Sequence, residues 1–271
     1  MDVFWFLLLP LTACLVLAGI HVYLGLHIVS RGVIFVDLAL AQVAALGATA
    51  AALFGHDIHG GEAYVWSLGA AFLGAVVLAF TRARRERVPQ EAFIGVVYVV
   101  SAAAAILVLQ KVPQGGEHIK DMLVGNILAV SWQDVGVTAA LYLVVGAFHW
   151  VFRKKFFLIT LEPGRARREG LALRWWDFLF YASLGVVVTW SVAMVGVLMV
   201  FSYLVIPAAA ASLLAGRTGP RLALGWIIGT LASALGIAAS FFFDLPTGAT
   251  IVCVFGATLA VIVPWSVWKK G

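Results

Sequence analysis

Charged residues are scarce in this chain. Asp, Glu, Lys and Arg make up 11% of its 271 residues, whereas 63% are hydrophobic, and soluble domains carry about 25% charged residues. So little charge excludes an ordinary soluble protein and leaves no room for a separate soluble catalytic domain. We therefore predict an all-α, polytopic membrane protein with a single helical bundle over residues 1–271.

The signatures of several other chemistries are also missing. The two cysteines, Cys14 and Cys253, lie in separate apolar segments without ligand-like spacing, which argues against a disulfide framework or a thiolate metal site. The nucleotide-binding pattern Gly-x-x-x-x-Gly-Lys-Ser/Thr does not occur, so any ATP would be used by another chain. No paired aspartates and no Ser–His arrangement stand out for catalysis. These absences predict a chain that is not an enzyme and holds no permanent cofactor.

Nine apolar runs are long enough to cross a bilayer, which takes about 20 residues. They lie near residues 4–28, 33–54, 63–80, 92–110, 134–152, 177–195, 197–215, 222–243 and 247–267. The sixth and seventh runs are short and nearly continuous. We therefore predict eight or nine membrane-spanning helices.

The positive charges gather on one side of this predicted bundle. Placing Arg31, the loops 81–91 and 153–176, the turn 216–221 and the C-terminal lysines on one side collects 16 of the 18 Lys and Arg residues there. By the positive-inside rule, this side faces the cytoplasm. The net charge of +5 follows from this topology, so we expect the lipid bilayer, and no nucleic acid, as a partner.

Two polar side chains interrupt the second apolar run, residues 33–54. Asp37 and Gln42 lie there among apolar neighbours. A carboxylate is costly in hydrocarbon and usually faces a bundle interior, a partner charge or a water-filled path. Asp37 and Gln42 therefore predict a translocation pathway. The alternatives are that a neighbouring helix satisfies Asp37 and that Gln42 forms a hydrogen bond across a helix interface.

The loop after this run carries four side chains that attract cations. They are His56, Asp57, His59 and Glu62. The topology places them outside, where we predict that they collect cations at the outer mouth. Ordinary solvated side chains of a surface loop are the alternative.

The cytoplasmic segment 161–170 has the sequence LEPGRARREG. Its charges, followed by Gly170, predict a short charged helix that ends at this glycine. Such a helix, exposed beneath the membrane, would suit the docking of a cytosolic partner.

Residues 114–133 form another irregular segment. Gly115, Gly116 and Gly125 interrupt a moderately apolar stretch that is too short to span the membrane. We expect a re-entrant or interfacial helix here.

Several motifs follow one another in a fixed order along the chain. They are RGVIFVDLALAQVAALG at 31–47, FIGVVY at 93–98, LVGNILAV at 123–130, VGVLMV through IPAAAA at 195–211, and DLPTGA at 244–249. In order and spacing, they resemble the permease family of metal-ion ABC importers, which take up zinc, manganese and iron. The resemblance extends over nearly the whole chain.

The resemblance implies a type II ABC-importer-like permease that works as a homodimer in the inner (plasma) membrane of a bacterial cell. Members receive a metal ion from an external or periplasmic solute-binding protein and are driven by cytosolic ATPase subunits. The cargo implied here is a divalent cation, zinc or manganese. The family's docking helix for the ATPase falls on Glu162, Arg165, Arg167, Arg168, Glu169 and Gly170.

The chain departs from the family pattern in the second run. Aligned on Gly32 and Gly47, the family's aspartate falls on Leu38 and its histidine on Gln42. A glutamine amide is a weaker, neutral oxygen ligand, so a different cation, a looser site or a ligand-free passage stay open. The small residues of the same run predict close helix contact, and we expect this span to line the interface between two copies.

Other functions are alternatives at this point. A related dimeric permease could import a metal chelate such as haem, cobalamin or a siderophore. From other classes, the chain could be an intramembrane enzyme or a secondary transporter coupled to protons through Asp37.

Overall fold

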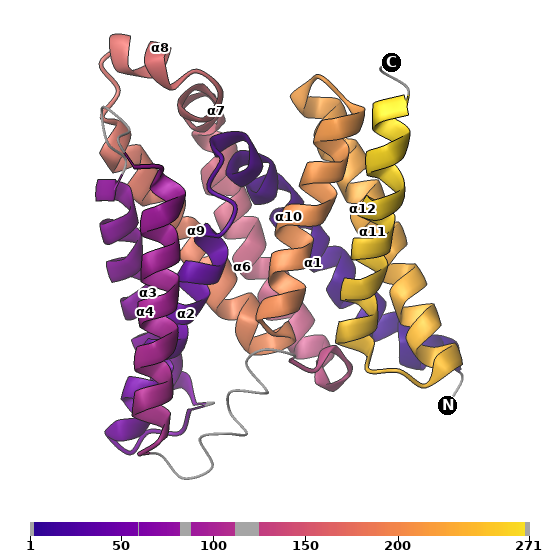
Figure 1. Ribbon diagram of the computed structural model, residues 1–271. Coiled ribbons are helices and arrows are strands. Elements are labelled where there is room, and N and C mark those ends of the chain that lie inside the picture. The colour runs from indigo at the N-terminus through magenta and orange to yellow at the C-terminus, as the bar shows by residue number, and fades with distance from the viewer. Residues whose placement is uncertain (1–2, 59, 82–87, 112–124, 269–271) are drawn as a thin grey trace. The chain divides into compact units, whose positions relative to one another are not determined.

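The computed structural model describes residues 3–58, 60–81, 88–111 and 125–268, and all regular elements within these ranges are helical (Figure 1). Nine helices in this part of the chain are long and apolar enough to cross a membrane. They are α1 (Val3–Arg31), α2 (Val36–Leu53), α3 (Gly61–Thr81), α4 (Gln90–Leu109), α6 (Trp132–Val151), α9 (Leu173–Val195), α10 (Val197–Leu214), α11 (Thr218–Phe243) and α12 (Thr247–Trp268). The all-α, multi-span prediction is confirmed.

A single glycine separates α9 from α10. Gly196 has a φ of +81°, a conformation that residues with a Cβ adopt only at a steric cost. The helical hydrogen-bond pattern therefore stops at this residue and starts again after it. The sixth and seventh apolar runs are therefore two separate helices. Of the predicted eight or nine membrane-spanning helices, the described residues form nine.

A second glycine lets the chain pack closely against this break. Gly125 has a φ of +59°, and a Cβ at this position would lie 2.1 Å from the carbonyl carbon of Val195. The short 3-10 helix η1 (Ile127–Ala129) follows, with the Asn126 side chain accepting a hydrogen bond from the amide of Leu128 at 3.2 Å. Of the segment 114–133, in which an interfacial helix was predicted, residues 114–124 lie outside the described part. From 125 to 131 the prediction is wrong, because this stretch holds only the 3-10 turn.

The helices group into two compact units. Unit 1 comprises residues 1–29, 123–143 and 191–271, and unit 2 comprises 30–122 and 144–190. Unit 1 contains α10, α11, α12 and most of α1. Unit 2 contains α2, α3, α4, α7 (Arg153–Leu161) and α8 (Pro163–Arg168). The single permease domain expected over residues 1–271 stays a prediction.

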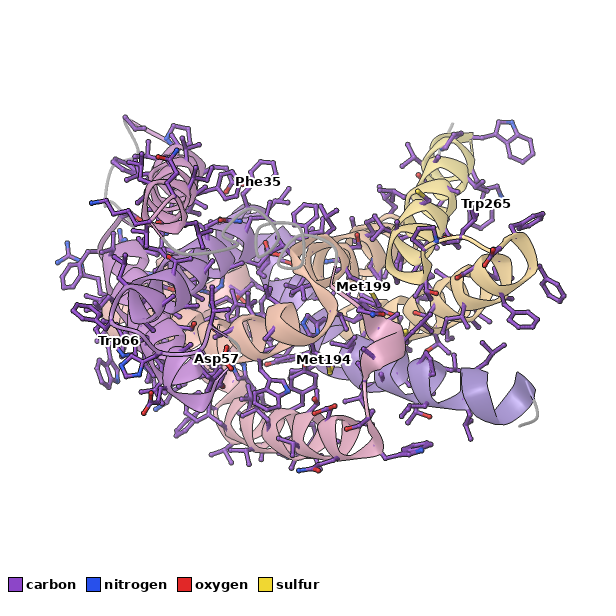
Figure 2. The ribbon with its side chains drawn as sticks, turned by 90° about the horizontal axis from the view of Figure 1, so that it is seen from below. Phe35, Asp57, Trp66, Met194, Met199 and Trp265 are labelled. Atoms are coloured by element: carbon purple, nitrogen blue, oxygen red, sulfur yellow. The ribbon has the colours of Figure 1, made fainter. Side chains whose placement is uncertain are left out.

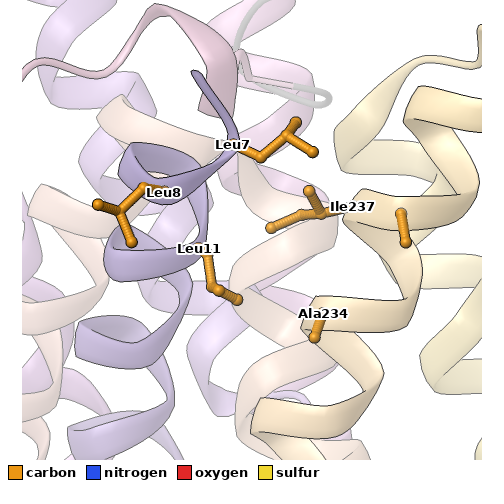
Figure 3. A pocket seen from close by; sticks show the side chains of 6 residues that line it. Leu7, Leu8, Leu11, Ala234 and Ile237 are labelled. Carbon is orange, nitrogen blue, oxygen red and sulfur yellow. The ribbon is translucent and has the colours of Figure 1, made fainter. Parts of the chain in front are cut away.

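Unit 1 is held together by packing of α10, α11 and α12. Tyr203 is fully buried, its hydroxyl lies 2.5 Å from that of Ser233, and its ring meets Phe255 edge-on. Leu7, Leu8 and Leu11 of α1 line an open crevice of about 150 Å³ with small and aliphatic side chains of α11, as Figure 3 shows. This lining is apolar, so the crevice offers no ligand for a metal ion.

Unit 2 packs α2 against α3 and α4. Ala41, Ala44 and Ala45 are 2–6% exposed, and a Cβ at Gly47 would lie 2.6 Å from the carbonyl oxygen of Trp66 in α3. These small residues are thus buried by their own chain. The expectation that this span lines an interface between two copies stays a prediction.

Candidate functional site

Asp37 lies in the first turn of α2 and is 1% exposed. Its carboxylate is beside the backbone amides of its own turn, where the positive end of the helix dipole favours a negative charge. One oxygen, Oδ1, is buried without a hydrogen-bond partner among the described residues. Buried polar atoms are seldom left unpaired. Within the described part of the chain, this oxygen is therefore open to a further ligand.

A second carboxylate acts on the same helix start. Glu91, in the first turn of α4, accepts a hydrogen bond at Oε1 from the amide of Phe35, 3.0 Å away. Its other oxygen, Oε2, is buried and has no partner in the described part of the chain. Glu91 is close enough to interact electrostatically with Asp37. Two buried carboxylate oxygens without a hydrogen-bond partner among the described residues thus lie near the start of α2.

Sequence reasoning missed Glu91. It follows four arginines and a proline in the loop 81–91, where a carboxylate is usually solvated. Its contact with Phe35 spans 56 residues of sequence. The one available signal was its position at the beginning of an apolar run, where an acidic residue sits in the first helical turn.

Gln42 lies further along α2 and is 7% exposed. Five residues from Asp37, it is about 140° away around the helix, and no hydrogen bond joins the two. The alternative, in which Gln42 forms a hydrogen bond across a helix interface, stays open. Its place in a pathway stays a prediction.

The structure brings together two of the four outer-loop residues. The Nδ1 of His56 forms an ion pair with the carboxylate of Glu62, and the two side chains are 34% and 72% exposed. Asp57, labelled in Figure 2, accepts a hydrogen bond at its backbone carbonyl from the amide of Gly60 at 2.9 Å. His59 lies outside the described residues. Within the described ranges, no three His, Cys, Asp or Glu side chains gather to hold a metal.

The segment 162–170 forms the short charged helix that the sequence predicts. Its helix, α8, ends where Gly170 takes a φ of +78°, and the amide of Leu171 bonds the carbonyl of Ala166 at 3.0 Å. Ala166 is fully buried and anchors the helix. The charged side chains on either side of it are exposed.

The charges of this segment are unevenly paired. Arg165 bonds Glu169 at 2.7 Å and Glu162 at 3.5 Å, and the hydrogen bond to Glu169, with both nearby carboxylates, raises the pKa of Arg165. In contrast, Arg167 and Arg168 form no ion pair with any described residue. They present the uncompensated positive charge of this surface.

Comparison with known proteins matches nearly the whole chain. The model of the ABC 3 transport family matches residues 4–266. The manganese transport system membrane protein MntC of Halalkalibacterium halodurans is 27% identical over 251 residues, which is 93% of this chain and 84% of that protein. The chelated iron transport system membrane protein YfeC of Yersinia pestis is 28% identical over 191 residues, or 70% of this chain and 65% of that protein.

The fold is shared with a solved structure. PsaBC from Streptococcus pneumoniae in complex with Fab has a TM-score of 0.78 and 21% identity to this chain, and the match covers 95% of this chain and 90% of that one. This likeness supports the helical architecture. It says nothing by itself about cargo or partners.

Proposed function

Because the chain belongs to the ABC 3 transport family, we propose that it is the membrane permease subunit of an ABC importer for a divalent metal cation. In this proposal it works as a homodimer in a bacterial inner membrane. Cytosolic ATPase subunits drive it, and an external or periplasmic binding protein delivers the ion. The metal is cargo, and the permease carries no resident cofactor.

The observation that carries the proposal is the unpartnered oxygen of Asp37 inside a membrane-spanning helix. A buried carboxylate without a protein cation is stable when an ion or proton can reach it. Glu91 adds a second oxygen ligand at the same helix start. Two carboxylates are fewer ligands than a resident metal takes, which suits an ion in transit.

The ligand chemistry favours manganese over zinc. Asp37, Glu91 and Gln42 offer oxygen atoms, which suit Mn²⁺, whereas imidazole and thiolate ligands suit Zn²⁺. Gln42 stands where the resembling family has a histidine. The similarity to a protein named for manganese transport supports the same choice.

The exposed segments would serve the partners. The exposed arginines of 162–170 suit an acidic groove on the ATPase, because unpaired surface charges strengthen encounter with an oppositely charged face. At the other end, His56, Asp57, His59 and Glu62 would attract the cation or contact the binding protein. His56 and Glu62 already pair with each other, so this contribution is modest.

Uptake of radioactive manganese in a deletion strain tests the proposal. Expression of the chain with its ATPase should restore uptake, and loss of the ATPase should remove it. Unlabelled Zn²⁺ and Fe²⁺ as competitors then rank the metals. Uptake that persists without the ATPase but stops when the proton gradient is collapsed would instead indicate a proton-coupled transporter.

A chelate permease is the second candidate. The similarity to a protein named for chelated iron transport favours it. Uptake of an iron chelate that excess free Mn²⁺ does not inhibit would support this alternative. Competition between the two would support a path for the free ion.

A further inference from the structure

A buried ion pair joins the end of α1 to the beginning of α9 within unit 2. Nη1 of Arg31 donates a hydrogen bond to Oδ1 of Asp177 at 3.0 Å, and the two side chains are 4% and 0% exposed. The guanidinium also lies 4.1 Å from the ring centre of Phe180. Removing one partner of such a pair would leave an uncompensated charge in the interior. The ion pair therefore fixes the end of α1 to the beginning of α9.

The same guanidinium reaches α7. Nε of Arg31 donates to the hydroxyl of Thr160 at 2.9 Å, and Thr160 is 6% exposed. Thr160 lies two residues before Glu162, where the charged segment 162–170 begins. The donors of a guanidinium are fixed in one plane. If Thr160 moves and Arg31 keeps its hydrogen bond to it, the contact between Arg31 and Asp177 must therefore change as well.

On its other side, Arg31 is joined to α2 by a short, restrained connection. Only residues 32–35 separate the two helices. Gly32 turns the chain with a φ of +67°, and the amide of Phe35, whose side chain is labelled in Figure 2, is held by Glu91 at 3.0 Å. Asp37 follows six residues after Arg31. Because the connection is only four residues long and is held at Phe35, a shift of Arg31 acts close to the start of α2.

We propose that Arg31 is a positioning residue that transmits movement of the segment 162–170 to the start of α2, where Asp37 lies. This inference rests on the proposed function, in which that segment receives the ATPase. The link runs from Thr160 through the buried side chain of Arg31 to the short connection 32–35, in which Val33 is buried and the other three residues are exposed. Moving α8 and the start of α2 together preserves the buried contacts, whereas moving them apart would break the bond to Thr160.

The test removes the bond to α7 without leaving a buried charge unpaired. Thr160→Val keeps the side-chain shape and the Arg31–Asp177 pair but deletes the hydroxyl. In vesicles that contain the permease, its ATPase and its binding protein, with Mn²⁺ as the cargo, we expect the ATP hydrolysed per ion imported to rise about tenfold, since a hydrogen bond to a charged group is lost. Thermal stability should fall slightly, because the buried Nε of Arg31 loses its acceptor, whereas association with the ATPase should be unchanged.

Two further variants separate transmission from folding. Thr160→Ser keeps the hydroxyl and should restore the wild-type ratio. Thr138→Val is the matched control, because Thr138 is a buried threonine of unit 1 whose hydroxyl bonds the carbonyl of Asp134 at 2.6 Å. It should leave the ratio unchanged.

A double variant tests the pair itself. Arg31→Met with Asp177→Leu removes both charges together, which buried pairs tolerate better than loss of one, and it should uncouple hydrolysis from import as Thr160→Val does. A wild-type ratio in Thr160→Val would overturn the link, whether or not the double variant folds. A wild-type complex without Mn²⁺-dependent hydrolysis is a separate result, which would overturn the proposed function and the link with it.

Discussion

Glu91 of α4 holds the start of α2 by accepting a hydrogen bond from the amide of Phe35 at 3.0 Å. One oxygen of this carboxylate thus has a structural role, while the other is buried without a described partner, as is an oxygen of Asp37. Mutation can separate the two roles of Glu91. The side-chain amide of glutamine can still accept the hydrogen bond from Phe35, but it carries no negative charge for a cation.

Glu91→Gln should keep the fold and lose transport. The glutamine oxygen can accept from Phe35, so the melting temperature should stay within the error of wild type. Manganese uptake should fall at least about tenfold, the factor for 1.4 kcal/mol of lost ion stabilisation. Glu91→Ala should in addition lower stability by about 1–2 kcal/mol, as loss of a helix cap does. Equal uptake by Glu91→Gln and wild type would confine Glu91 to its structural role.

Asp37→Asn tests the buried carboxylate directly. The change keeps the size and removes a charge whose Oδ1 has no partner in the described structure, so folding should not suffer. Uptake should be abolished or fall at least about tenfold, while abundance in the membrane and association with the ATPase persist. Normal uptake would reduce Asp37 to a packing residue, and loss of the folded protein would make it structural.

The arginines of 162–170 should differ in their effect on docking. Arg167→Glu with Arg168→Glu reverses the charges that no described side chain pairs, so co-purification with the ATPase should drop several-fold and become more sensitive to salt. Arg165→Ala should reduce co-purification with the ATPase less, because Glu162 and Glu169 already compensate the charge of Arg165. A stronger effect from Arg165 than from the other two would contradict this assignment of the docking face.

Two glycines make a matched test of the fold. Gly125→Ala places a Cβ 2.1 Å from the Val195 carbonyl carbon at a φ of +59°, and overpacking with backbone strain should cost about 2–4 kcal/mol. Gly136→Ala has open space and lies in an exposed part of α6, so it should be neutral or stabilise by up to about 1 kcal/mol. Thermal unfolding in detergent measures both, and equal melting points would refute the close approach.

The fold was more predictable than the site. Apolar runs have lengths that a bilayer dictates, so the spans could be placed from the sequence. The separation of α9 from α10 depends on the positive φ of Gly196, which composition does not reveal. The alanines of α2 indicated close packing correctly but not its partner, because the same small surface suits α3 of the same chain or a second copy. Glu91 was missed because its role depends on a contact with Phe35, far away in the sequence.

Gln42→His should change the metal preference. Gln42 is 7% exposed within α2, and the substitution introduces the imidazole that the resembling metal-ion permeases have at this position. Imidazole is a better ligand for Zn²⁺ than an amide oxygen, whereas Mn²⁺ prefers oxygen. Competition assays should therefore show Zn²⁺ inhibiting manganese uptake at lower concentration than in wild type, with Gln42→Asn as a control that keeps an amide. An unchanged order of competitors, in a protein that still transports manganese, would place Gln42 outside the ion path.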